Sequence, residues 1–305
     1  MSSLAFLVNE EAPKIENIIQ RENQLARTLI VVTIVSATFV VAFSEWAIKK
    51  PTGNIGLSAF ISEAGSICLY FLAPIWFMLW RQKEEEALKV ALLFYSFNLV
   101  IMALVDYLTK GGLRQELHLS PQVNNPKLLW GLLMLLPWAP LIILSLRNPS
   151  GAQRIGLGTA NWKENIFVGI LAGAFLGAHM LLVVTAMGRK LILNPWPYSL
   201  WLLGYELGIQ SLGEELFFRG FLFNYWHNYQ GRGFWFSAFL TGFLNVLVYM
   251  VKALWVSFAP LTIGAQFYVL TMAVVNAALF RWRGSLLSCW LSNAVFSLIA
   301  SLVVS

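Results

Sequence analysis

Charged residues are scarce in this chain of 305 residues: Asp, Glu, Lys and Arg together make up 12%, whereas hydrophobic residues make up 58%. A soluble domain carries about a quarter of its residues as charges, so the composition excludes an ordinary soluble protein. Cysteine is almost absent, with Cys68 and Cys289 each inside an apolar run. Both are expected to be small buried hydrophobes, and two cysteines so placed form neither a disulfide framework nor a paired metal motif.

Apolar runs of membrane-spanning length dominate what remains. None shows the alternation of about ten residues that a membrane β-barrel strand requires. The sequence therefore predicts an all-α fold, a polytopic membrane helix bundle of about eight to ten transmembrane helices. We expect spans near residues 25–48, 56–80, 87–108, 128–146, 165–187, 200–226, 234–255, 261–280 and 285–304.

Basic residues are distributed unevenly among the loops between these runs. The side that holds the N-terminus collects more Lys and Arg, which favours a cytoplasmic N-terminus in a multi-pass protein of the cytoplasmic (plasma) membrane. The net charge of +6 is spread over many loops. Anionic lipid matches that pattern, so membrane lipid is an expected partner and nucleic acid is not.

The longest interruption before the most polar span lies between Arg147 and Lys163 and includes Asn148-Pro149-Ser150-Gly151. Such a turn-forming stretch predicts a boundary. We expect residues 1–150 to form about four N-terminal membrane helices and residues 151–305 to form a core of about five.

The run at residues 200–226 carries the sequence Gly213-Glu214-Glu215-Leu216-Phe217-Phe218-Arg219-Gly220. Ionisable groups at that depth are costly and usually mark function. In one continuous helix, Glu215 and Arg219 stand at i and i+4 and are expected to form an ion pair. The alternative role of this pair is to fix helix packing alone.

Glu214 is rotated by about 100° from its neighbour along an α-helix and cannot share the arginine equally. Gln210 and Glu206 precede it at four-residue steps, which predicts a polar stripe leading to Glu214. We therefore expect one carboxylate to be structural and the other, Glu214, to be reactive. A proton or ion pathway along this stripe is a weaker hypothesis, since the other spans supply few charges.

These residues resemble the first motif of the CPBP family of intramembrane proteases, which includes CAAX proteases and bacteriocin-processing enzymes. The resemblance rests on paired glutamates, an arginine four residues after the second, and the glycine and aromatic residues beside it. It covers roughly residues 154–304 and implies a bundle whose core holds a peptidase site.

Two later motifs of that family carry histidines, and this chain departs from both. Alignment by spacing places Asn245 and Asn293 at the histidine positions, and Ser297 at the last position of the third motif. An amide can donate a hydrogen bond to an oxyanion, but it cannot take up a proton and is a poor zinc ligand. The resemblance by itself allows a divalent metal held by the family's histidines, but here we expect no metal and no other cofactor.

The resemblance implies a peptidase that cleaves membrane-associated peptides, including CAAX-like ones, with water activated by Glu214. Glu215 and Arg219 would support that carboxylate, and Asn245 and Asn293 would donate to the oxyanion. These five form the predicted catalytic set, and Glu214, Asn245 and Asn293 are expected to converge. Candidate substrate-binding residues are Glu206, Gln210, Ser297 and His179.

The loss of both histidines keeps a second reading open. A catalytically degenerate relative would use the same cavity to bind a membrane protein or lipid, as a scaffold, chaperone or regulator. Retention of the whole first motif favours the enzyme, because a non-catalytic bundle has less need of Glu214 once Glu215 and Arg219 are paired. Expected partners are thus a membrane-embedded or lipidated peptide, or a partner protein.

Overall fold

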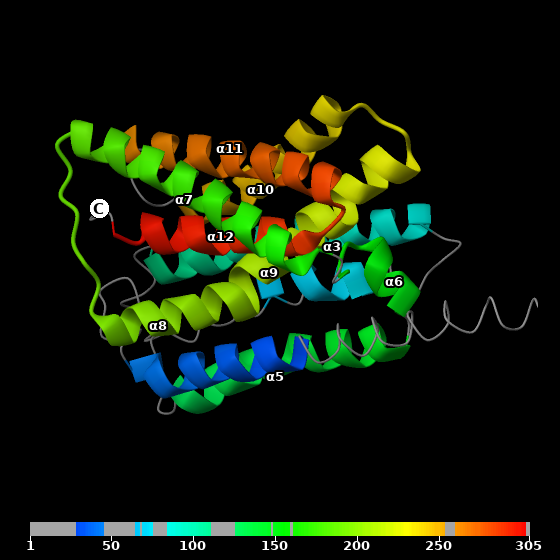
Figure 1. Ribbon diagram of the computed structural model, residues 1–305, viewed down its shortest axis with the longest axis horizontal. Helices are drawn as coiled ribbons and strands as arrows, with labels where there is room; N and C mark the ends of the chain where they lie inside the picture. The colour runs from blue at the N-terminus through cyan, green and yellow to red at the C-terminus, as the bar shows by residue number, and fades with distance from the viewer. Residues whose placement is uncertain are drawn as a thin grey trace, which may run out of the picture.

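The computed structural model describes residues 29–45, 65–67, 69–75, 84–110, 126–147, 149–158, 161–253 and 260–302. The elements in these ranges are helices, packed side by side as a bundle (Figure 1). Each of the predicted runs contains helix in its described part. The chain is an all-α polytopic membrane helix bundle, as predicted. The principal helices are 29–45, 65–75, α3 (Glu84–Lys110), α5 (Pro126–Arg147), α6 (Pro149–Arg154), α7 (Trp162–Ala186), α8 (Trp196–Tyr205), α9 (Ser211–Glu215), α10 (Phe234–Ala253), α11 (Pro260–Arg283) and α12 (Leu286–Ala300).

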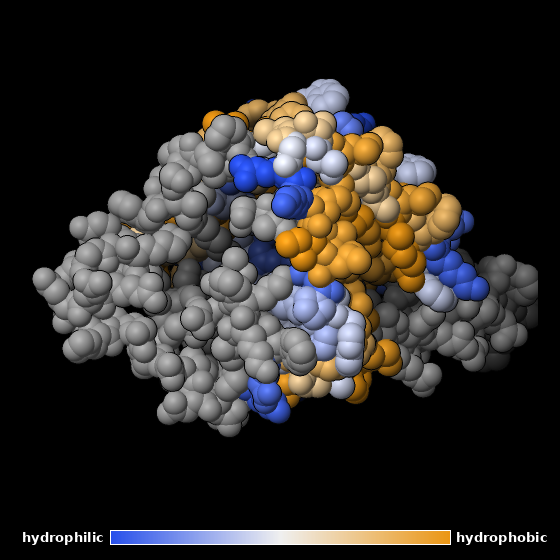
Figure 2. All heavy atoms as spheres, turned by 90° about the vertical axis from the view of Figure 1, so that its left-hand side faces the viewer, coloured by the Kyte–Doolittle hydropathy of each residue, from blue (hydrophilic) through white to orange (hydrophobic). Residues whose placement is uncertain are grey.

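Among the described residues, 4 helices are long and apolar enough to cross a membrane: Glu85–Leu104, Trp162–Ala186, Phe234–Val251 and Ile263–Arg283. Several shorter apolar helices accompany them. Large apolar side chains stay exposed along α7, including Phe167, Phe175 and Leu182, and Figure 2 shows a broad apolar surface at one end of the bundle. In water such a surface would be unfavourable, whereas lipid covers it without cost.

The motif Gly213–Gly220 lies on a helical segment that runs without a break from Trp196 to Tyr229, here called the signature segment. The prediction of one long helix over 200–226 is therefore confirmed, but its geometry is only partly α-helical. Three wide π-helical stretches interrupt it: η1 (Glu206–Gln210), η2 (Leu216–Phe223) and η3 (Tyr225–Tyr229). Such turns occur most often at functional sites, because they change which side chains share a face.

Helix α12 is held against α7 by three glycines spaced four residues apart, Gly169, Gly173 and Gly177. A Cβ atom on Gly173 would lie 2.3 Å from the Ser292 carbonyl oxygen, and one on Gly169 would lie 2.5 Å from the Ser288 oxygen. Small residues at this spacing let two membrane helices approach closely. The close approach fixes the height of α12 relative to α7, and the next residue after Ser292 is Asn293.

The turn before α12 also fixes its position. Gly284 follows the end of α11 with φ of +62°, a conformation that glycine adopts without strain. Ser285 then caps α12, and its hydroxyl accepts a hydrogen bond from the Leu287 N–H at 3.3 Å. Helices α11 and α12 consequently run antiparallel, side by side.

The N-terminal helices pack directly on the helices of the core. The indole N–H of Trp138 on α5 donates to the Gly208 carbonyl oxygen at 2.5 Å, and Gly208 lies in a π-helical turn. Tyr95 on α3 donates to the carbonyl oxygen of Leu244 on α10. One hydrophobic cluster contains buried residues from both parts of the chain. The division at residues 150 and 151 stays a prediction.

Candidate active site

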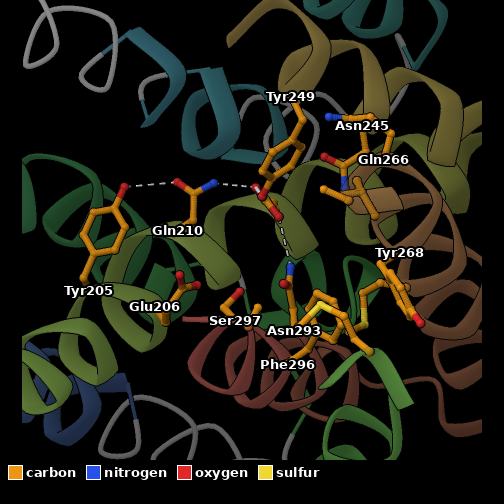
Figure 3. A pocket seen from close by; sticks show the side chains of 16 residues that line it. Tyr205, Glu206, Gln210, Asn245, Tyr249, Gln266, Tyr268, Asn293, Phe296 and Ser297 are labelled. Carbon is orange, nitrogen blue, oxygen red and sulfur yellow. Dashed lines mark hydrogen bonds between the residues drawn. The ribbon is translucent and has the colours of Figure 1, made fainter. Parts of the chain in front are cut away.

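A cavity of about 430 Å³ lies among α7, α10, α11, α12 and the signature segment. Figure 3 shows its lining, with polar side chains from the signature segment facing others from α10, α11 and α12. The cavity brings together residues that are far apart in the sequence, which only the tertiary fold can do. Its lining consists of Met180, Tyr205, Glu206, Gln210, Glu214, Asn245, Tyr249, Ala265, Gln266, Tyr268, Val269, Met272, Asn293, Phe296, Ser297 and Ala300.

Glu214 lies at the centre of a hydrogen-bond network, although only 2% of its surface is exposed. Its Oε1 accepts from the side-chain amide of Gln210 and from the Tyr249 hydroxyl, the latter at 2.6 Å. Its Oε2 accepts from Nδ2 of Asn293 at 3.0 Å. The donors come from the signature segment, α10 and α12, so three elements position this carboxylate (Figure 3). A buried carboxylate needs such donors to offset its lost hydration.

Glu215 points to a different environment and is not part of the cavity lining. Its Oε2 lies 3.2 Å from Nε of Arg219, and both side chains are at most 1% exposed. Its Oε1 accepts from Nδ2 of Asn276 at 2.9 Å and from Nδ2 of Asn293 at 3.1 Å. The predicted ion pair at i and i+4 is therefore present and sealed from solvent.

Asn293 contacts both glutamates through one amide nitrogen. Its distances to Glu214 Oε2 and Glu215 Oε1 are nearly equal, at 3.0 Å and 3.1 Å. A primary amide has two hydrogens, so each carboxylate can receive one. This geometry makes Asn293 the bridge between the two carboxylates.

Asn245 lines the same cavity and is 3% exposed. Its Oδ1 is buried without a hydrogen-bond partner, and no contact between its amide and either glutamate occurs among the described residues. Of the three residues expected to converge, Glu214 and Asn293 are hydrogen-bonded to each other, whereas Asn245 only lines the same cavity. From α10 it is Tyr249, one turn further on, that reaches Glu214.

The candidate substrate-binding residues divide into two groups. Glu206, Gln210 and Ser297 all line the cavity. Glu206 accepts from the Ser211 hydroxyl at 2.5 Å, a five-residue step that follows from the π-helical turn. His179 lies outside the lining: its side chain is exposed on α7, and its Nδ1 is 2.8 Å from the Tyr268 hydroxyl.

Three features of the site were missed by sequence reasoning. Tyr249 and Asn276 contact Glu214 and Glu215 from α10 and α11, but a tyrosine and an asparagine within apolar runs carry no spacing signal of their own. The stripe formed by Gly169, Gly173 and Gly177 did carry a signal, the four-residue spacing of small residues.

Among the described residues, no group of three or more His, Cys, Asp or Glu side chains comes together as a metal-binding cluster. The side chains around Glu214 are instead amides and phenols. Of the two predicted buried cysteines, Cys289 is 0% exposed in the bundle core, and Cys68 lies outside the described residues.

Residues 195–299 match the family model described as type II CAAX prenyl endopeptidase Rce1-like. This range begins with α8 and includes the glutamate pair, Arg219, Asn245 and Asn293. Over it, the chain is similar to CAAX-type intramembrane proteases, which confirms the resemblance to the CPBP family. The matched range begins later than the predicted one, which started at residue 154. Searches of curated proteins and of solved structures gave no match.

Proposed function

We propose that this protein is an intramembrane peptidase in which Glu214 activates a water molecule for attack on a peptide bond. The observation that supports this most strongly is the separation of the paired glutamates. Glu214 lines a cavity and is held by neutral donors, whereas Glu215 is sealed against Arg219. A packing role alone would not place one of two adjacent carboxylates in a cavity with three donors from three elements.

Glu214 retains capacity to bind water. An ionised carboxylate offers about four acceptor sites. Donors occupy three of them here, two on Oε1 and one on Oε2. The remaining site on Oε2 is the position we assign to the attacking water. Gln210 and Tyr249 fix the carboxylate so that this site keeps its direction.

In the proposed reaction, Glu214 takes a proton from water as the water oxygen bonds to the peptide carbonyl carbon. The oxyanion that forms is stabilised by the side-chain N–H of Asn245, which lines the same cavity as Glu214. The carbon–nitrogen bond then breaks, and Glu214 returns the proton to the leaving amine. The products are a carboxylic acid and an amine, so the atoms balance with water as the only co-reactant.

Asn293 is better suited to positioning than to oxyanion binding, because Glu214 and Glu215 occupy both hydrogens of its amide. Arg219 and Glu215 act one step further away. Their ion pair fixes the segment that carries Glu214 and keeps the second carboxylate from repelling it at full strength.

The donor set does not fit a zinc site. Structural and catalytic zinc prefers imidazole, thiolate and carboxylate ligands, and the side chains that contact Glu214 are two amides and a phenol. Glu215, the second carboxylate, is engaged by Arg219. The reaction proposed here therefore passes through no metal, and we propose that no other cofactor is needed.

The substrate proposed is a membrane-associated peptide, including CAAX-like sequences, that enters the cavity from the bilayer. The exposed apolar faces of the helices support contact with membrane lipid. We further propose residence in the cytoplasmic membrane with the N-terminus in the cytoplasm, on the uneven distribution of basic residues among the loops.

One observation favours a second candidate, a degenerate relative that binds a membrane segment or lipid without cleaving it. Asparagine stands at both histidine positions of the family motifs, so no imidazole contributes to proton transfer. In this alternative, the Glu214 network serves only to shape the cavity.

The two candidates are separated by cleavage of a membrane-peptide library by the purified chain in lipid. We expect products that disappear in Glu214→Gln, with a rate loss of about 10²-fold to 10⁴-fold for removal of a general base, and that persist with a chelator. Glu85→Gln is the matched control, because Glu85 pairs with Lys89 on the exposed surface of α3.

Products that vanish with the chelator would contradict the metal-free reaction. No product from the native chain, under conditions in which the protein stays folded, would reject the peptidase and support the degenerate relative.

A further inference from the structure

Two primary amides in the cavity have side-chain oxygens that are buried without a hydrogen-bond partner in the described protein. Besides Asn245 on α10, Gln266 on α11 lines the cavity, and its Oε1 is buried without a partner. Figure 3 shows the two side chains next to each other, on the side of the cavity opposite Glu206 and Ser297. A buried amide oxygen without a partner is costly, so two of them in one cavity call for an explanation.

The packing of α10 on α11 accounts for their proximity. Gly242 allows this close approach, because a Cβ there would lie 2.9 Å from Cδ1 of Leu270 and 3.1 Å from Cβ of Ala273. The helices run antiparallel, so one turn further along α10 and one turn back along α11 the neighbours are Asn245 and Gln266.

The remaining polar groups of the cavity are largely engaged with one another. Glu214 accepts from its three donors, Gln210 also accepts from the Tyr205 hydroxyl at 3.2 Å, and Ser211 donates to Glu206. The buried side-chain atoms of the lining that lack a partner are Asn245 Oδ1 and Gln266 Oε1, on the α10 and α11 side, and each belongs to an amide that carries both a donor and an acceptor.

We infer that Gln266, together with Asn245, binds the main chain of a peptide substrate. A peptide unit offers one N–H and one C=O, and a primary amide offers the complementary pair. This match does not depend on which way either amide is turned, a choice that hydrogen-bond networks and not atom positions decide. A lipid ester or hydrocarbon chain offers no N–H donor and would leave one end of each amide unmet.

The inference rests on the proposed function, since it names the part of the substrate that the cavity holds beside Glu214. Asn245 would hold the reacting peptide group, and Gln266, one step along the cavity, would hold a neighbouring one. Gln266 is thus a binding residue that sets the direction in which the peptide lies. Loss of this contact would weaken substrate binding without changing the chemical step.

The test measures binding without turnover. The full-length chain with Glu214→Gln is placed in lipid nanodiscs and titrated with a short dye-labelled peptide of leucine, valine and alanine. Gln266→Met keeps the length of the side chain and removes its hydrogen bonds. We expect it to weaken peptide binding by about fivefold to tenfold, the effect of one lost hydrogen bond or slightly more. Gln153→Met is the matched control, because Gln153 is exposed on α6, outside the cavity lining.

A second series locates the contact on the peptide. Replacement of one peptide bond at a time by an ester removes a single N–H. One position should weaken binding to the chain with Gln266 by a similar factor and have no further effect on Gln266→Met, as expected for two partners in one contact. In the otherwise native chain, Gln266→Met should raise KM and leave kcat within about twofold, the signature of lost uniform binding.

Equal binding of the peptide by the chain with Gln266 and by the Gln266→Met variant would overturn the inference, and so would a chain that binds no peptide at all. Displacement of the peptide by a dye-labelled diacyl lipid, with equal affinity for both proteins, would assign the cavity to lipid instead. Because binding is measured without cleavage, these results are distinguishable from failure of the peptidase proposal. A chain that binds peptide through Gln266 but never cleaves it would retain the inference and reject the enzyme.

Discussion

The two faces of the signature segment differ although their glutamates are adjacent in sequence. Glu214 faces a cavity and is held by neutral donors from three elements, whereas Glu215 faces the packed interior and is paired with Arg219. Asn293 donates to both. Neighbouring carboxylates thus acquire separate roles from their partners, because a rotation of about 100° per residue along the helix directs them to different neighbours. Loss of stability should follow changes on the packed face, and loss of activity should follow changes at the cavity.

Removal of the arginine from the packed face should have the largest effect on stability. Arg219→Met leaves Glu215 buried without a counter-charge, which is expected to destabilise the bundle by about 3–5 kcal/mol. The measurement is thermal or denaturant unfolding in detergent. Arg232→Met is the control, because Arg232 is exposed after the end of the segment.

The double variant Glu215→Gln with Arg219→Met should recover part of that stability, since no charge is then left unpaired. If Arg219→Met unfolds at the same temperature as the native chain, the ion pair does not stabilise the packed face, and the structural role given to Glu215 is contradicted.

Gly173→Ala tests whether the contact between α7 and α12 positions Asn293, which bridges Glu214 and Glu215. The added methyl group would lie 2.3 Å from the Ser292 carbonyl oxygen, so α12 must move, at a cost of about 1–3 kcal/mol for overpacking. Because Asn293 follows Ser292, both stability and peptide cleavage should fall together. Gly264→Ala is the control, as a Cβ there meets nothing within 4 Å. Native activity in Gly173→Ala would show that the position of α12 is not fixed by this contact.

Asn293→Ala removes the one described side chain that donates to both carboxylates. Each glutamate keeps other partners, so we expect a smaller loss of stability, about 1–2 kcal/mol for the unmet acceptors. Cleavage should fall by about tenfold or more if the two carboxylates must be held in a fixed relation. The kinetic constants and the unfolding midpoint are both measured. A variant that loses stability and keeps full activity would restrict Asn293 to a packing role.

Tyr249→Phe should give the smallest effect on stability, and an effect confined to Glu214. It removes one donor from Glu214 without changing volume, for a cost of about 0.5–1.5 kcal/mol, and it leaves the Glu215 pair intact. Tyr268→Phe is the matched control, since Tyr268 lines the same cavity but its hydroxyl contacts His179. We expect a lower rate of cleavage for Tyr249→Phe alone, with both proteins unfolding close to the native temperature. Equal rates for the two variants would remove Tyr249 from the network that orients Glu214.

The predicted spans and the ion pair were accessible to sequence reasoning because each depends on local chemistry. Apolar length identifies a span, and the four-residue step from Glu215 to Arg219 tolerates the π-helical turn between them. The step from Glu206 was less predictable: its partner within the segment is Ser211, five residues on. Hydrophobic periodicity carries no information about where a wide turn begins.

The sequence by itself determined the membrane class, the helical fold, the family resemblance over residues 195–299 and the presence of two carboxylates with one arginine. The tertiary structure decided which carboxylate faces the cavity, that Tyr249 and Asn276 are partners of the two glutamates, and that Asn245 and Gln266 line one cavity with side-chain oxygens that lack a partner. The reason is that burial and local spacing follow from the sequence of a single helix, whereas a hydrogen-bond partner from another helix depends on how closely the two helices approach. Here that approach depends on three glycines of α7 that face α12 and on Gly242 of α10, which faces α11.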